Sequence, residues 1–167
     1  MSCRRLYAAL RGLAAAVALC GLLAACSAAG GEEVAWRFRT LDEAGWESGD
    51  TLVFATDSLP RAGRYATQVM VRTSAARPCP FTAVALGVRR SWSGPGAPPP
   101  RVDTVWVELT TPRGDVTGPG VSIYQYAVTL DTLDLPAGCR GTVALEHLMR
   151  CFTLPGLRDA GVRVVEL

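Results

Sequence analysis

Two residue types that often carry chemistry are nearly missing from this chain of 167 amino acids, which has one histidine, His147, and no lysine. A histidine-based metal site or a Ser-His-Asp triad would have to be built around His147. That residue lies in a predicted strand beside Glu146, where a packed or surface histidine is more common than a catalytic one. The chain has no C-x-x-C pair and no glycine-rich loop before a helix, which argues against thiolate zinc sites, thioredoxin-like centres and phosphate-binding loops. We therefore predict no catalytic residue, no metal and no cofactor.

Two other kinds of site stay open, because their residues meet in space rather than in sequence. A glycosidase mechanism needs paired carboxylates, and the candidates are Asp50, Asp57, Asp103, Glu108 and Asp131. Most of them fall in predicted turns or at outward strand positions, so a solvated surface is the simpler interpretation. A sugar-binding face needs aromatic rings, and the candidates are Trp36, Trp46, Trp92 and Trp106. Packing is the commoner role of aromatic side chains on a sandwich.

The chain also lacks a hydrophobic run long enough to cross a membrane. The longest, Leu13–Ala25, has 13 residues, whereas a transmembrane helix needs about 20. It follows a segment with three arginines and no acidic residue, and it ends at Leu23-Ala24-Ala25-Cys26, which has the form of a bacterial lipobox. We predict a lipoprotein signal peptide over residues 1–25, cleavage before Cys26, and acyl chains on the Cys26 sulfur that attach the protein to a membrane. A plain secretory signal is the alternative.

Net charge after the predicted cleavage is close to zero. All 15 acidic residues and 14 of the 17 arginines follow Cys26, which leaves the mature chain at −1. The formal +2 of the whole chain therefore belongs to the export signal. Because nucleic-acid-binding domains present a basic surface, we predict no nucleic-acid partner.

Cysteine is too scarce for a disulfide scaffold. With Cys26 acylated, the mature chain keeps Cys79, Cys139 and Cys151. Cys139 and Cys151 lie near the two ends of the predicted strand Thr142–Arg150, roughly 35–40 Å apart, whereas a disulfide needs Cα atoms within about 7 Å. A disulfide, if present, would thus involve Cys79, with either Cys139 or Cys151. Free thiols are the alternative.

Apolar residues after the signal alternate in short runs separated by glycine and proline turns, a pattern typical of β-strands. No window shows a helical period of ten or more residues. The runs predict about eight strands and a two-sheet antiparallel β-sandwich, jelly-roll or immunoglobulin-like, over residues 34–167 after a tether at 26–33. The predicted strands are Val34–Thr40, Thr51–Thr56, Arg64–Thr73, Thr82–Arg90, Asp103–Thr110, Ile123–Asp131, Thr142–Arg150 and Val162–Glu166. Ser93–Arg101 is a proline-rich loop.

Several segments resemble the GldH family, the gliding-motility lipoproteins of Bacteroidota. The strongest is the C-terminal stretch from His147 to Val164, in which Met149-Arg150 is followed by Leu154-Pro155-Gly156-Leu157-Arg158-Asp159 and Gly161-Val162-Arg163-Val164. Weaker similarities are Trp46, Asp50, Phe54, Tyr65, Arg72, Pro80-Phe81, Asp103-Thr104-Val105, Leu109, Gly114, Gly118-Pro119-Gly120 and Ile123-Tyr124. Cys79 departs from the family, which usually has an aromatic residue before that proline, and so does the loop Ser93–Arg101.

The resemblance implies a lipid-anchored envelope protein of the gliding machinery, linked in that phylum to type IX secretion, with other envelope proteins as partners and no catalytic activity. Pro155-Gly156 would make a turn, with Asp159 capping it or pairing with Arg150 or Arg163. The sharper hypothesis is a partner-docking patch of Arg150, Asp159 and Arg163. Ser27 after Cys26 favours the outer membrane facing the periplasm, while Glu32-Glu33 leaves surface export open. A carbohydrate-binding lipoprotein and, less favoured, a hydrolase are the alternative functions.

Overall fold

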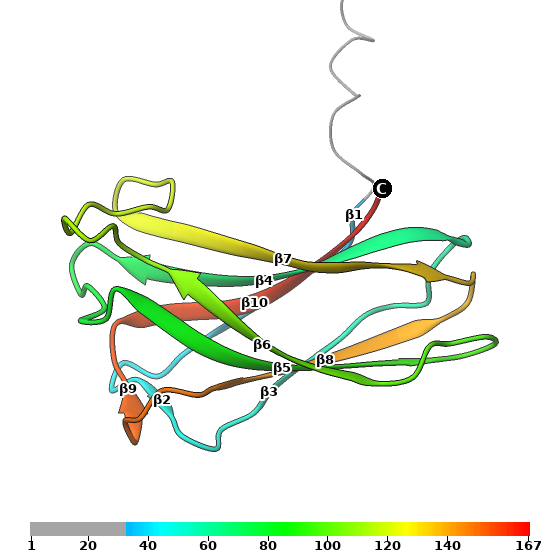
Figure 1. Cartoon of the computed structure of the whole chain (residues 1–167), viewed down its shortest axis with the longest axis horizontal. Helices are drawn as coiled ribbons and strands as arrows, with labels where there is room; N and C mark the ends of the chain where they lie inside the picture. The colour runs from blue at the N-terminus through cyan, green and yellow to red at the C-terminus, as the bar shows by residue number, and fades with distance from the viewer. Residues whose placement is uncertain (1–32) are drawn as a thin grey trace, which may run out of the picture. The chain divides into compact units, whose positions relative to one another are not determined.

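A computed structural model describes residues 33–167, which form two packed antiparallel sheets (Figure 1). In sheet A the strand order is β1-β10-β4-β7, and in sheet C it is β3-β8-β5-β6. A third, small sheet pairs β2 with β9. The strands are β1 (Glu33–Thr40), β2 (Trp46–Glu47), β3 (Leu52–Ala55), β4 (Gly63–Ser74), β5 (Ala83–Ser93), β6 (Arg101–Glu108), β7 (Ile123–Leu135), β8 (Arg140–His147), β9 (Thr153–Leu154) and β10 (Leu157–Glu166). Residues 33–167 contain no helix.

The predicted all-β sandwich is confirmed, and each of the eight predicted strands overlaps an observed one. The chain passes repeatedly between the sheets, because only β5 and β6 form a hairpin within one sheet. The predicted signal peptide at 1–25, the acylation site Cys26 and residues 26–32 of the tether lie outside the described residues.

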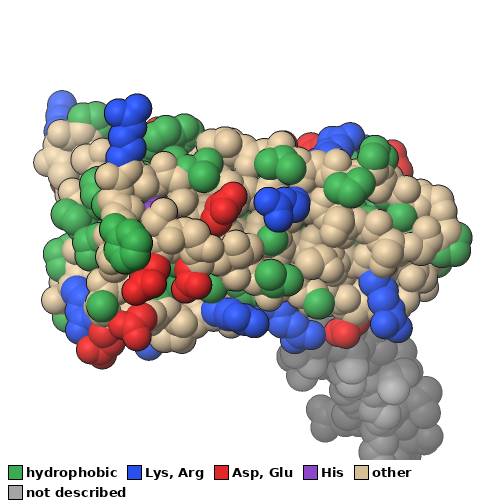
Figure 2. All heavy atoms as spheres, turned by 90° about the horizontal axis from the view of Figure 1, so that it is seen from below, with side chains coloured by type: hydrophobic (Ala, Val, Ile, Leu, Met, Phe, Trp, Pro, Cys, Tyr) green, Lys and Arg blue, Asp and Glu red, His purple; other side chains and the backbone are tan. Residues whose placement is uncertain are grey.

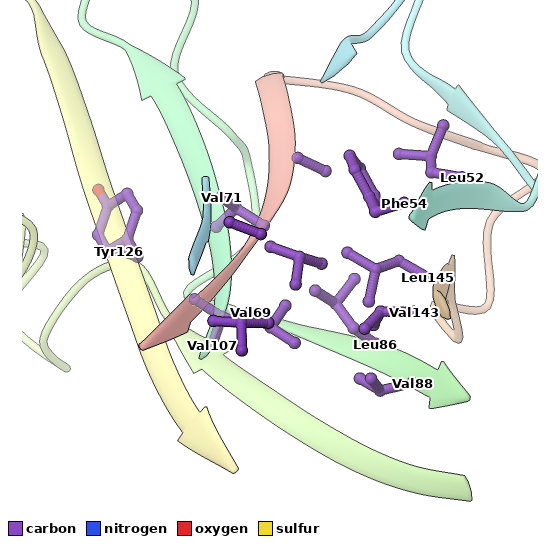
Figure 3. Packing of buried hydrophobic residues seen from close by; sticks show 14 of the residues in the cluster. Leu52, Phe54, Val69, Val71, Leu86, Val88, Val107, Tyr126, Val143 and Leu145 are labelled. Carbon is purple, nitrogen blue, oxygen red and sulfur yellow. The ribbon is translucent and has the colours of Figure 1, made fainter. Parts of the chain in front are cut away.

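The hydrophobic core lies between sheets A and C (Figure 3). Strand periodicity explains it, because alternate side chains point to opposite faces of a sheet. On β4, Tyr65, Val69 and Val71 point inward and are at most 1% exposed, as their alternation predicted. On β6, Val107 is 1% exposed and Val105 packs against the same core.

Two details differ from the sequence-based expectation. The pair β2–β9 was not predicted, because two-residue strands show no periodicity. Strand β10 begins at Leu157 rather than Val162, directly after the turn at Pro155 and Gly156. Asp159 is therefore a strand residue and not a turn cap: its cross-strand neighbours are Thr40 of β1 and Arg72 of β4.

Candidate functional site

Two of the three predicted docking residues lie on the outer face of sheet A. Ala160, Val162 and Val164 of β10 point into the core, so Asp159 and Arg163 point to the opposite side. Cross-strand register places Trp36 of β1 opposite Arg163, and Thr40 and Arg72 on either side of Asp159. We call this surface the sheet-A face and define it by Trp36, Phe38, Arg72, Asp159 and Arg163.

Arginines and aromatic rings stack on the sheet-A face. The guanidinium carbon of Arg72 lies 3.7 Å from the ring centroid of Phe38, and that of Arg163 lies 5.9 Å from Trp36. Arg72 Nε donates a hydrogen bond to Gln125, and Arg163 Nε one to Glu33 at 3.1 Å. A Cβ added at Gly161 would lie 2.6 Å from Cδ1 of Phe38. The Phe38 ring therefore occupies the space that a side chain at residue 161 would fill. Such stacking stabilises most where water is partly excluded, and it orders a face of mixed aromatic and cationic character.

Asp159 and Arg150 have different surroundings from Arg163. Asp159 is only 7% exposed; its Oδ1 accepts a hydrogen bond from Thr40 Oγ1 at 2.8 Å, and its Oδ2 lies 3.6 Å from Arg158 Nε. Its carboxylate thus links β10 to β1. Arg150 is exposed in the connection between β8 and β9. Within residues 33–167 no ion pair joins Arg150 to Asp159 or to Arg163.

His147 is a packed residue at the end of β8. It is 4% exposed and meets the buried Trp46 edge to face, with ring centroids 5.8 Å apart. Burial lowers the pKa of His147, while backbone groups of Trp46 and Glu47 and the charge of Glu146 oppose that shift. A neutral imidazole enclosed by core side chains lacks the access to substrate that a general base requires.

Two of the candidate carboxylates share one buried arginine. Arg90 of β5 is 2% exposed and donates to Asp103 of β6 at 2.6 Å and to Asp131 of β7, which also accepts from Arg101. Partial burial alone would raise the pKa of Asp131, but the hydrogen bond from Arg90 and the charges of both arginines outweigh it, and the net shift is downward. Both carboxylates are therefore ion-pair partners of Arg90: the pair with Asp103 lies within sheet C, and the pair with Asp131 joins sheet C to sheet A. The solvated-surface interpretation describes Asp103 and Asp131 only in part, because their side chains are 38% and 36% exposed but also pair with the buried Arg90.

The four tryptophans do not form one aromatic surface. Trp46 and Trp92 are buried at 1% and 8% exposure. Trp36 is exposed on the outer face of sheet A, and Trp106 points away from the core on sheet C. The two exposed rings thus lie on opposite sides of the sandwich, where they cannot contact one sugar chain together.

The described residues form no metal cluster, and the face seen in Figure 2 carries charges of both signs. Residues 33–167 contain no group of three or more histidine, cysteine or acidic side chains placed to hold a metal ion. Figure 2 shows arginine and carboxylate side chains on the same face, interspersed with apolar ones. No helix able to span a bilayer occurs among the described residues.

A comparison with models of known protein families identifies the family of this chain. The family model described as GldH lipoprotein matches residues 33–164, nearly the whole described domain. The chain belongs to the GldH lipoprotein family. The resemblance found in the sequence is thereby confirmed, and membership of a lipoprotein family implies association with the cell envelope. No curated protein matches the chain.

Solved structures give distant likenesses to this GldH domain. One is a family GH115 4-O-methyl-α-glucuronidase, BtGH115A, with 14% identity and a TM-score of 0.45 over 83% of this chain and 18% of that one. Another is the K3 adhesin domain of Lys-gingipain from Porphyromonas gingivalis w83, with 15% identity and a TM-score of 0.32 over 83% of this chain and 99% of that one. A third is an aminopeptidase from a Thaumarchaeota archaeon, with 15% identity, a TM-score of 0.34, and coverage of 83% and 32%. The chain spans less than a third of the two enzymes.

Sequence reasoning missed Arg90, Arg72 and Phe38 as organising residues. A signal for Arg90 existed, because it continues the inward alternation of Leu86 and Val88 along β5. The stacking of Arg72 on Phe38 had no comparable signal, since it depends on β1 and β4 both lying next to β10.

Proposed function

We propose that the protein is held in the cell envelope by acyl chains on Cys26 and acts there, without catalysis, as an assembly component of gliding machinery linked to type IX secretion. The observation that supports this most directly is the match of the GldH lipoprotein family over residues 33–164. The lipobox that ends at Cys26 supports the anchor. We further propose the outer membrane, facing the periplasm, as the site of attachment.

The roles found for the candidate catalytic groups support a non-enzymatic function. His147 is enclosed beside Trp46, Asp103 pairs with Arg90, and Asp131 pairs with both Arg90 and Arg101. A glycosidase mechanism needs two carboxyl groups that face a substrate, whereas Asp103 and Asp131 are both paired with the buried Arg90. What the domain offers instead is a rigid sandwich with an ordered outer surface.

The anchor is tested by Cys26→Ser. Two or three acyl chains make membrane attachment stable, whereas loss of all of them removes the hydrophobic contribution of about 0.8 kcal/mol per buried methylene. We expect wild-type protein in the membrane fraction, acylated and without residues 1–25, whereas the variant should carry no acyl chain, and any of it that keeps residues 1–25 is counted separately from the cleaved form. Mass spectrometry of wild-type protein should find an acylated Cys26 as the first residue. An unmodified N-terminus, or one that begins elsewhere, would refute the anchor.

The proposed docking patch is tested on its two accessible arginines. Complexes crosslinked in host cells and recovered with tagged Arg150→Ala or Arg163→Ala should contain about tenfold less of the partner proteins, because arginines in interfaces are frequently hot spots. Arg113→Ala is the matched control, since Arg113 is an exposed loop arginine in the connection between β6 and β7.

Protease added to intact cells should leave the domain uncut if it faces the periplasm.

Asp159 requires a separate comparison because it is buried. Asp159→Ala should lower the melting temperature whatever its effect on partners, because it removes the acceptor of the hydrogen bond from Thr40 and the carboxylate beside Arg158. If the folded Arg150→Ala and Arg163→Ala proteins recover as much partner protein as the wild type, the docking patch is refuted and the three residues have only structural roles.

A further inference from the structure

Two half-buried thiols lie close together at one end of the sandwich. Cys79 belongs to the connection between β4 and β5, and Cys151 to the connection between β8 and β9. Both pack against the hydrophobic core. Burial raises the pKa of the Cys79 thiol, a backbone hydrogen bond at Phe81 lowers it, and the charge of Cys151 raises it further. Both thiols are free in the structure, and it is the course of the backbone around them that places them at the same end of the sandwich.

The backbone around the two cysteines explains their proximity. The chain leading to Cys151 runs antiparallel to the chain that follows Cys79: His147 lies opposite Leu86, and Leu148 N donates to Ala85 O at 2.9 Å. Met149 Sδ lies 3.4 Å from Ala85 N, which continues this approach beyond the end of β8.

The turn after Cys151 also meets Cys79. A Cβ built at Gly156 would lie 2.3 Å from the Cα of Cys79, so the two backbones are in direct contact. The segment that starts at Cys151 thus returns against the residue with which its thiol would pair.

Cys139 is excluded as the partner. It is fully buried, and its Sγ donates to Pro95 O at 3.7 Å, beside the hairpin that joins β5 to β6. Cys139 precedes β8 and Cys151 follows it, and a strand of that length spans roughly 25 Å. All three thiols are free in the structure, which is the alternative that the sequence also left open. Of the two possible pairings, the backbone contacts favour Cys79 with Cys151.

We propose that Cys79 and Cys151 form a disulfide in the exported protein, which joins the β4–β5 connection to the β8–β9 connection. This inference rests on the envelope location in the proposed function, because disulfides form and persist in oxidising compartments. The oxidant is the disulfide of a thiol–disulfide oxidoreductase. The thiolate of one cysteine attacks the oxidoreductase disulfide and forms a mixed disulfide with the oxidoreductase. The thiolate of the other cysteine then attacks this mixed disulfide and releases the oxidoreductase. The oxidoreductase leaves as a dithiol, which carries away the two electrons and two protons.

The test uses full-length protein extracted from the envelope, denatured in the presence of N-ethylmaleimide so that buried thiols also react, and digested without reductant. We expect a peptide pair linked through Cys79 and Cys151, with alkylated Cys139. Cys79 and Cys151 both alkylated, or a link from Cys79 to Cys139, would overturn the proposal. The same digest reports the acylation of Cys26, so failure of the anchor and failure of the disulfide are read separately.

Thermal unfolding gives a second readout. Reductant should lower the melting temperature of the wild type by about 10 °C, because a disulfide that closes a long loop restricts the unfolded chain. Cys79→Ser, Cys151→Ser and the double variant should all melt near the reduced wild type and not respond to reductant. Cys139→Ser should keep both the linked peptide and the response. A wild-type melting temperature that reductant leaves unchanged would also overturn the proposal.

Discussion

Replacing Asp103 and Asp131 together by asparagine is expected to destabilise the domain more than replacing the arginine that they share. The double variant leaves the charge of Arg90, 2% exposed, without a counter-ion. Guanidinium cannot lose its proton at accessible pH, and removing one side of a buried ion pair costs about 3–5 kcal/mol. We expect a loss of this order in the free energy of unfolding, measured by urea denaturation.

The matched variants follow from the exposure of each partner. Arg90→Met leaves two carboxylates that are 36% and 38% exposed, and water can solvate them, so we expect a smaller loss of about 2 kcal/mol. The triple variant that combines all three replacements should regain much of the stability of the double variant, because no charge is left buried. Arg101→Met should change little, since Arg101 is half-exposed and such pairs contribute about 0–1 kcal/mol.

Acid gives an independent check on the same ion pairs. The folded state lowers the pKa of Asp131 below its unfolded value of about 4. The resulting stability is fully present above that value and is lost as pH falls through the lower pKa of the folded state. Arg90→Met should therefore flatten the fall in stability below about pH 4. If the double variant were as stable as Arg90→Met, or the acid response were unchanged, Arg90 would not be the charge that these carboxylates neutralise.

The strands were predictable from the sequence because their side chains alternate. On β4 and β6 the inward set is apolar along most of the strand, and this pattern gives both the type of element and its buried face. The two short strands β2 and β9 were not predictable, because their pairing depends on where the connections from β1 and β8 meet in space.

The contacts of the candidate site were less accessible to sequence reasoning. Asp103 and Asp131 come from strands in different sheets, and only the fold shows that both reach Arg90. Asp159 was misplaced because proline and glycine before it obscured the start of β10. Family resemblance identified the segment around Asp159 as characteristic, but not the carboxylate's role in holding β1.

Gly156→Ala is expected to lower the free energy of unfolding by about 3 kcal/mol or more. Gly156 has φ +83°, a conformation that costs an L-residue about 1–2 kcal/mol. An added Cβ would also lie 2.3 Å from Cys79 Cα and 2.6 Å from Cys79 N. Both atoms belong to backbone, so no flexible side chain can move away, and the overlap must be relieved by shifting the turn.

Gly138→Ala separates backbone strain from the overlap at Gly156. Gly138 has nearly the same φ, +81°, but a Cβ there would meet nothing within 4 Å. We expect it to lose only about 1–2 kcal/mol, and the difference between the two variants measures the contact with Cys79. Equal losses would mean that the turn moves freely away from Cys79. A larger loss at Gly156 would show that the β9–β10 turn is held against the β4–β5 connection at Cys79.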